Sequence, residues 1–281
     1  MKILITGHLG FVGSETTRLL QELGYQIIGY DILEKNDIRD SENLKQTIEQ
    51  TKPDRILHLA AVARFSDADH DPWLAYETNV LGTKNISYLA AHYHIPLVYA
   101  STGSVYMPIQ QAPPITEEFP IKGNSVYGCS KAVGEKYVEK YGVPYIILRY
   151  AHLYGKEKRG HGLIGGFMQR IERGLSPTLY GGKQSNDFTY IKDIARANYM
   201  ALTASWDKWN QAYNIGTGEE LTAEQAGKII CKAAKYKGKI EIKEQRNVDP
   251  QRFVYDTTKA EQILGFKAQY SFEKGLQDMF S

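Results

Sequence analysis

Tyr127 and Lys131 stand four residues apart, a spacing that places both side chains on one face of a helix. A phenol with a pKa of about 10 is a poor base at neutral pH. A neighbouring ammonium stabilises the phenolate and lowers that pKa. The pair therefore predicts a general base that takes a proton from a substrate hydroxyl and returns it in the reverse step. A solvated Tyr–Lys pair on a helix surface is the alternative.

A hydroxyl-rich segment precedes this pair, where residues 98–106 run from a buried strand into a loop. Thr102, or Ser101, stands at the end of that strand and could hold the substrate oxygen and share its proton with Tyr127. Ser and Thr also cap strand ends without any catalytic role, which is the alternative interpretation.

The segment that follows the first apolar run contains three glycines, Gly7, Gly10 and Gly13. Glycine allows the backbone to turn tightly and to approach a pyrophosphate, and a helix N-terminus offers free N–H groups. The GxxGxxG spacing is a weak signal alone, but Asp31 stands 18 residues after Gly13, at the end of the second predicted strand. A carboxylate there binds ribose hydroxyls and repels a 2′-phosphate, which favours NAD over NADP. The alternative is an ordinary strand–helix turn with a surface aspartate.

The segment from Asp37 to Asp40 allows two interpretations. Asp37 could contact the adenine amino group while Ile38 stacks on the base. Alternatively, the segment is only the entry to a helix, capped by Asp40 or Ser41.

The elements that must position these residues alternate along the first half of the chain. Strands are predicted at 2–6, 25–30, 54–60, 96–101 and 144–150, and helices at 11–23, from 41 to before Pro53, at 71–94 and at 127–141. Strands separated by helices of this length form right-handed crossovers. The sequence therefore predicts an α/β fold with a doubly wound, Rossmann-like parallel sheet.

The second half is less regular. Residues 155–162 and 174–187 read as loops, followed by helices near 193–205, 222–236 and 257–264 and a strand at 212–215. Because ligands bind beyond the carboxyl ends of parallel strands, we expect these segments to form a smaller C-terminal substrate-binding lobe. The predicted division is an NAD-binding domain of residues 1–151 plus about 187–214, and a lobe of about 152–186 plus 215–281.

Composition excludes several classes of protein. The 281 residues carry 34 basic and 32 acidic side chains, a formal charge of +2 that gives no sign of a nucleic-acid partner. Two cysteines build no disulfide framework, and no Cys/His cluster has the spacing of a metal site. The N-terminal apolar run is too short for a signal peptide, and no stretch approaches a membrane span. We expect a cytoplasmic protein.

Taken together, the motifs resemble those of the extended short-chain dehydrogenase/reductases, specifically the nucleotide-sugar epimerase/dehydratase family. The matching segments cover nearly the whole chain: TGHLGFVG (6–13), DIRD (37–40), HLAA (58–61), ETNVLGT (77–83), STGSVY (101–106), YGCSK (127–131), LRYAHLYG (148–155), NDFTYIKD (186–193), YNIGTG (213–218) and DTTKAEQILGF (256–266).

The resemblance implies Thr102, Tyr127 and Lys131 as catalytic residues and NAD as cofactor. It also implies a homodimer formed through the helices near 76–94 and 127–141. The expected NAD-binding residues are Gly7, Gly10, Phe11, Val12, Gly13, Asp31, Asp37, Ile38, Leu59, Ala60, Ala61, Ala63, Asn79, Ala100, Ser101, Tyr127, Lys131 and Tyr150.

Departures from the family pattern bear on the reaction. Dehydratases of this family carry Asp-Glu after the catalytic threonine, whereas this chain has Gly103 and Ser104, which cannot act as acid and base. We therefore expect an epimerase acting on a nucleotide-diphosphate sugar, at C4, through a transient keto sugar. The alternatives are an NAD(P)H-dependent reductase of a nucleotide-linked 4-keto-6-deoxy sugar and a non-catalytic NAD-binding regulator.

The substrate side departs further. His152 stands where the family often has Asn, and Asn186 where it often has an arginine for the diphosphate; losing a bidentate cation is not a conservative change. His152 could equally be a packed histidine. Arg246, with Arg252 as a further candidate, is expected to bind phosphate. The expected substrate-binding residues are Thr102, Gly103, Ser104, His152, Asn186 and Arg246. Arg159 and His161 belong to a charged loop that could approach the substrate or simply be solvated.

Overall fold

Six parallel strands form the central sheet of the computed structural model, which describes residues 1–106, 114–123, 125–156, 162–244 and 252–280. The strands are β1 (Lys2–Thr6), β2 (Gln26–Tyr30), β3 (Arg55–His58), β4 (Leu97–Thr102), β5 (Tyr145–Tyr150) and β10 (Gln211–Ile215). Their spatial order is β10-β5-β4-β3-β1-β2, so the direction of winding reverses between β1 and β3. Ligands bind at such a reversal in doubly wound sheets.

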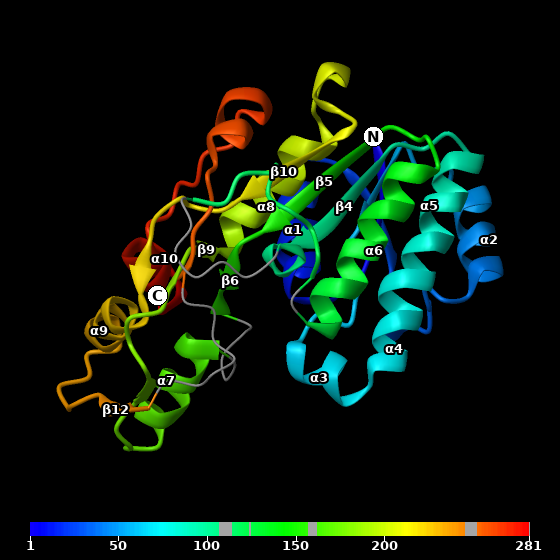
Figure 1. Cartoon of the computed structure of the whole chain (residues 1–281). Helices are drawn as coiled ribbons and strands as arrows, with labels where there is room; N and C mark the ends of the chain where they lie inside the picture. The colour runs from blue at the N-terminus through cyan, green and yellow to red at the C-terminus, as the bar shows by residue number, and fades with distance from the viewer. Residues whose placement is uncertain (107–113, 124, 157–161, 245–251, 281) are drawn as a thin grey trace.

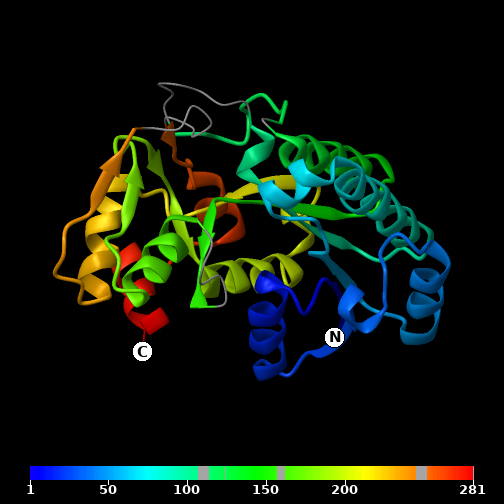
Figure 2. The ribbon, with the colours of Figure 1, turned by 90° about the horizontal axis from the view of Figure 1, so that it is seen from below.

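Helices cover both faces of this sheet (Figures 1 and 2). On one side lie α1 (Phe11–Glu22) and α8 (Ile191–Leu202), and on the other α2 (Ser41–Thr51), α5 (Thr83–His92) and α6 (Val126–Lys140). Strand alternation divides the core accordingly, since Ile3 and Ile5 pack toward α1 whereas Leu4 packs toward α2 and α5. The predicted doubly wound α/β fold is confirmed.

Local capping explains where several helices begin. The Asp40 carboxylate accepts hydrogen bonds from the N–H groups of Glu42 and Asn43 at 3.1 and 3.0 Å, so it is the cap of α2. The helix expected over 71–94 begins at Pro72, is capped by Asp71 and consists of α4 (Pro72–Tyr76), a π-helical turn (Glu77–Gly82) and α5. A short helix, α3 (Phe65–His70), precedes it and was not predicted.

The remaining elements gather to one side of the sheet, on the left of Figure 1. They are β6 (His152–Tyr154), α7 (Gly162–Glu172), β7 (Thr178–Tyr180), β8 (Ser185–Asn186), β9 (Phe188–Tyr190), β11 (Leu221–Thr222), α9 (Ala223–Ala233), β12 (Glu241–Lys243), β13 (Arg252–Phe253) and α10 (Phe272–Phe280). They form three small sheets, β11-β8-β13, β12-β7 and β6-β9. The expectation that 174–187 is only a loop is wrong, because β7 and β8 lie within it and pair with strands distant in sequence.

Helices α7 and α10 were not predicted from the sequence. By contrast, α9 follows the expected pattern, with Thr222 and Gln225 forming a reciprocal capping box at its start. Among the described helices, none has the length and apolar character needed to cross a membrane.

Candidate active site

A cleft of about 1800 Å³ opens beyond the carboxyl ends of the central strands and is bounded by the elements at the side of the sheet. Most of the residues expected to bind ligands line it: Gly7, Gly10, Phe11, Val12, Gly13, Asp31, Asp37, Ile38, Leu59, Ala60, Ala61, Ala63, Ala100, Ser101, Thr102, Gly103, Ser104, Tyr127, Lys131, Tyr150, His152 and Asn186. Residues from at least seven separate sequence segments therefore meet at one surface.

The glycine loop joins β1 to α1 at the floor of this cleft. Gly7 has φ +73°, a left-handed conformation, and a Cβ there would lie 2.8 Å from the backbone nitrogen of Ala60. A Cβ on Gly13 would overlap the carbonyl oxygen of Gly7. Gly10, the N-cap of α1, supplies no side-chain hydrogen bond, and the first turn of the helix lines the cleft. This cradle fits the pyrophosphate of a dinucleotide.

Asp31 directly follows β2 beside the glycine loop and is 6% exposed. Its Oδ2 accepts a hydrogen bond from the N–H of Leu9, and its Oδ1 accepts one from the N–H of Leu33, both at 3.0 Å. These bonds fix the carboxylate at the cleft edge with its remaining lone pairs available for ribose hydroxyls.

Asp37 and Ile38 both line the cleft, but each also has a structural role. The guanidinium of Arg39 donates to the Asp37 carboxylate, a bond that lowers the pKa of Asp37, and it also donates to Glu77. Ile38 is 4% exposed and packs closely against Gly82 at the start of α5. The functional and structural interpretations of this segment are therefore compatible.

Asn79 is the one expected NAD-binding residue that does not line the cleft. It is fully buried, and its side-chain amide exchanges hydrogen bonds with the backbone of Val62 and donates one to Ser130 Oγ at 2.9 Å. Asn79 therefore ties the loop after β3 to helix α6. Asn79 thus stabilises the wall of the cleft from the interior of the protein and is not part of the cleft surface.

Thr102, Tyr127 and Lys131 converge at the cleft from β4 and α6. Ser125 caps α6 by accepting from the N–H of Gly128, which sets the first turn containing Tyr127. Burial raises the pKa of Tyr127 to about 12, while a hydrogen bond with the Thr102 side chain acts in the opposite direction. Burial lowers the pKa of Lys131 to about 7, opposed by the charge of Glu135.

These pKa values differ from the sequence prediction that Lys131 lowers the pKa of Tyr127. Burial is the largest influence on the pKa of both groups. The Lys131 ammonium lies 4.0 Å from the centroid of the Tyr99 ring. The hydroxyl, phenol and amine are thus assembled in one cleft.

A buried ion pair that sequence reasoning missed stands behind these groups. Arg149 on β5 donates to both carboxylate oxygens of Glu135 on α6, at 3.0 and 2.8 Å, and both side chains are nearly inaccessible. Ser101 Oγ also donates to Glu135 at 2.5 Å. The available signal was the spacing, since Glu135 follows Lys131 by one helical turn. The ion pair joins β5 to α6, and the bond from Ser101 joins the end of β4 to the same helix.

Gly103 leaves no room for a side chain. A Cβ at this position would overlap the Phe253 ring and would lie 2.6 Å from the Tyr255 hydroxyl. An aspartate could therefore not occupy this position without displacing two aromatic residues.

The substrate side of the cleft is largely neutral around His152 and Asn186. His152 is exposed, its N–H donates to the carbonyl of Asp187, and its ring lies 5.5 Å from that of Phe188 in an edge-to-face arrangement. Phe253 pairs in register with Asn186 and lines the same wall.

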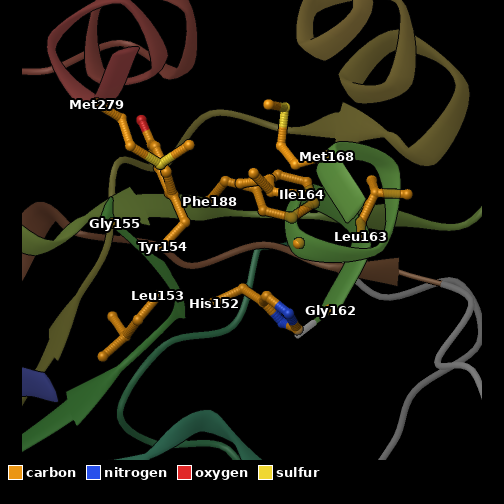
Figure 3. Close-up of a pocket in the computed structure, with 11 residues that line it drawn as sticks. His152, Leu153, Tyr154, Gly155, Gly162, Leu163, Ile164, Met168, Phe188 and Met279 are labelled. Carbon is orange, nitrogen blue, oxygen red and sulfur yellow. The ribbon is translucent and has the colours of Figure 1, made fainter. Parts of the chain in front are cut away.

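Figure 3 shows a small pocket of about 30 Å³ beside His152, lined by Tyr154, Phe188 and the methionines of α7 and α10. This volume admits water but not a sugar ring, so a substrate would occupy the larger cleft.

The arginines that were expected to bind phosphate lie in different places. Arg252 forms a two-point ion pair with Glu220, at 2.7 and 2.8 Å, and does not line the cleft. Arg246, Arg159 and His161 fall outside the described residues. Arg170, Arg173 and Lys243, which sequence reasoning did not select, line the part of the cleft formed by α7, β7 and β12.

Comparisons with known proteins agree with this arrangement. The profile described as "NAD dependent epimerase/dehydratase family" matches residues 3–216. A Methanocaldococcus jannaschii protein provisionally named UDP-glucose 4-epimerase is 34% identical, over 98% of this chain and 96% of its own.

Two solved structures share the fold over this whole chain. The Thermotoga maritima UDP-glucose 4-epimerase with UDP-glucose is 29% identical with a TM-score of 0.91, and 97% of it is covered. The Thermus thermophilus UDP-glucose 4-epimerase with NAD is 28% identical with a TM-score of 0.88, and 98% of it is covered. Because the family profile spans both the glycine loop and the helix of Tyr127 and Lys131, this chain belongs to the NAD-dependent epimerase/dehydratase family, as its motifs predict.

Proposed function

We propose that this protein is an NAD-dependent epimerase that inverts C4 of a nucleotide-diphosphate sugar, with a UDP-hexose as the first substrate to test. The observation that carries the proposal is the convergence of Thr102, Tyr127 and Lys131 on the same cleft as the glycine loop and Asp31. Relatives named UDP-glucose 4-epimerase support the choice of sugar nucleotide and carbon.

The residues that would hold NAD are those that line the inner half of the cleft. The loop of Gly7, Gly10 and Gly13 would bind the pyrophosphate, and Asp31 the adenosine ribose. Asp31 presents a carboxylate where NADP carries its 2′-phosphate, so NAD is the expected cofactor. When bound, NAD supplies reversible acceptance of a hydride.

The chain's own residues would move the proton. The Tyr127 phenol would take the proton of the sugar hydroxyl, while the Thr102 side chain, hydrogen-bonded to it, orients the same oxygen. The positive charge of Lys131 would stabilise the phenolate. Rotation of the keto sugar in the wide cleft, return of the hydride to the opposite face of the carbonyl carbon, and return of the proton from Tyr127 to its oxygen would complete the inversion.

The packing around Gly103 supports epimerisation over dehydration. Loss of water needs an additional acid and base near the reacting carbons. Phe253 and Tyr255 fill the space that a side chain at position 103 would need, and Ser104 follows as a neutral hydroxyl.

Tyr127→Phe tests this function. The variant retains the ring and removes the proton carrier, so we expect normal NAD binding and at least a 100-fold loss of turnover, the usual range for losing a general base. The assay follows UDP-glucose and UDP-galactose interconversion by chromatography and NADH by absorbance.

Wild-type protein should interconvert the sugars with no net NADH change. Stoichiometric NADH consumption would instead identify the keto-sugar reductase, and unchanged biological activity of the variant would identify a non-catalytic NAD-binding regulator.

We also propose a homodimer formed through α5 and α6. Tyr88 and Val133 are 54% and 44% exposed on these adjacent helices, and Tyr141 packs edge-to-face on Tyr88. Exposed apolar side chains grouped on neighbouring helices are typical of a protein interface. The division of the chain into two domains and the cytoplasmic location stay predictions from the sequence.

A further inference from the structure

The Lys131 side chain has an aromatic partner that the proposed mechanism does not use. Its Nζ lies 4.0 Å from the centroid of the Tyr99 ring, and the two side chains are 2% and 0% exposed. Within the described chain, Nζ makes no hydrogen bond or ion pair of normal length. An ammonium over a ring face is stabilised by the ring quadrupole, and the effect is largest where water is excluded.

Tyr99 is in turn fixed at its hydroxyl end. Strand alternation directs Tyr99 and Ser101 toward α6, where a Cβ on Gly134 would overlap the Tyr99 hydroxyl. That hydroxyl is buried without a well-formed hydrogen bond among the described residues, although Thr83 lies near enough to lower its pKa.

Thr83 itself is fixed, because it donates to the Asn79 carbonyl at 2.7 Å and lies 3.0 Å from His58 Nε2. The hydroxyl end of the Tyr99 ring is therefore enclosed between Gly134 and Thr83.

We propose that Tyr99 is a positioning residue for Lys131: its ring face, packed between β4 and α6, holds the ammonium at the cleft. The inference rests on the proposed function, since it assigns Tyr99 a role that acts through the catalytic lysine of that function.

The groups that face Lys131 leave few sources of stabilisation for its charge. From β3, His58 is neutral, because burial and the charge of Lys131 hold its pKa well below the usual range. On α6, Tyr127 has a pKa raised to about 12 by burial. On β4, burial raises the pKa of Tyr99 itself. Glu135, one turn along α6, is the remaining group that favours the ammonium. The ring and Glu135 together therefore oppose the desolvation that lowers the pKa of Lys131.

Tyr99→Leu and Tyr99→Phe separate the ring from the hydroxyl. Tyr99→Leu removes the ring, so we expect the pH above which kcat/KM falls to move down by about one unit, the shift that a desolvated cation–π contact provides. Tyr99→Phe keeps the ring and should stay within about twofold of wild type with an unmoved pH profile. Thermal unfolding and NAD binding at pH 6.5 show whether each variant is folded.

A steric variant at Gly134 tests the position of the Tyr99 ring even if Tyr99→Leu fails to fold. Gly134→Ala places a methyl group against the Tyr99 hydroxyl and should displace the ring, which lowers activity at alkaline pH. Adding Tyr99→Phe removes the oxygen in conflict and should restore most of that loss. A double variant no better than Gly134→Ala alone would mean that displacement of the Tyr99 ring does not cause the loss, which would contradict the positioning role.

A direct titration of Lys131 separates this inference from the proposed function. In NAD-free protein labelled with ¹³C at lysine Cε, the Lys131 signal is identified by its loss in Lys131→Met, and its pKa is read by NMR. Tyr99→Leu should lower that pKa while Tyr99→Phe leaves it unchanged. An unmoved pKa in Tyr99→Leu overturns the inference, even in an active enzyme. A moved pKa in a protein without epimerase activity would support the role of Tyr99 and refute the proposed function alone.

Discussion

At the scale of single residues, Lys131 shows the cost of placing a charge inside a protein. It is buried on α6, and burial lowers its pKa to about 7, from about 10.4 in an unfolded chain. Between these pH values the unfolded chain binds more protons than the folded protein, so the free energy of unfolding rises as the pH increases. A residue kept for catalysis therefore weakens the NAD-free fold at neutral and acidic pH.

Lys131→Met should stabilise the NAD-free protein while abolishing turnover. We expect an increase in the free energy of unfolding on the order of a few kcal/mol at pH 6 to 7, shrinking toward pH 10, where the lysine is neutral in both states. Urea unfolding across this pH range measures it. Lys136→Met, on the same helix with a side chain that is 65% exposed, is the control and should show no such pH dependence. A stabilisation that did not vary with pH would mean that packing, not charge, is responsible.

The residues themselves were predictable to different degrees. The glycines, Asp31 and the pair Tyr127 and Lys131 carry chemistry that a linear pattern reveals, and all of them line the cleft. Tyr99 could not be selected, because a tyrosine in a buried strand reads as core and its contact with Lys131 depends on how β4 meets α6. Asn79 was assigned from the family pattern alone, and its buried hydrogen bonds place it behind the wall.

At the scale of elements, the strand–helix alternation was predictable and the small lobe was not. Parallel strands with both faces buried are continuous apolar runs, and the helices between them have a clear period. Strands β8, β11 and β13 are two residues long and exist only through partners far away in sequence, so no local pattern marks them. Helix α7 contains Gly165 and Gly166, which weaken the helical signal.

The loop between β1 and α1 is the element most sensitive to one methyl group. Gly13→Ala would force a Cβ into the carbonyl oxygen of Gly7, so either the loop or the start of α1 must move. We expect at least a tenfold loss of NAD affinity, measured by calorimetry, with the sheet still folded. Thr17→Ala, one turn further along α1 at a residue that does not line the cleft, is the control and should bind NAD normally. Equal losses in both variants would contradict a steric cause at position 13.

At the scale of the whole molecule, helix α6 links the cleft to the surface. One face carries Tyr127 and Lys131, both in the cleft. Another carries the exposed Val133 and Tyr137, which stacks on Tyr141 at the end of α6, and Tyr141 packs edge-to-face on Tyr88 of α5. In Figure 1, α5 and α6 lie side by side as the outer layer of the sheet. A partner subunit packed on this layer would therefore restrain the same helix that presents the catalytic phenol.

Replacing the exposed apolar groups of this layer with charge should dissociate the dimer. Tyr88→Glu and Val133→Glu would each bury a carboxylate in the interface, because these positions are about half exposed in a single chain. Light scattering after gel filtration should give twice the 31.8 kDa chain mass for the wild type and one chain mass for the variants. Leu23→Glu, at an exposed apolar position at the end of α1, is the control and should stay dimeric. Variants that keep the wild-type mass would exclude α5 and α6 as the interface, whereas a monomeric wild type would exclude the dimer itself.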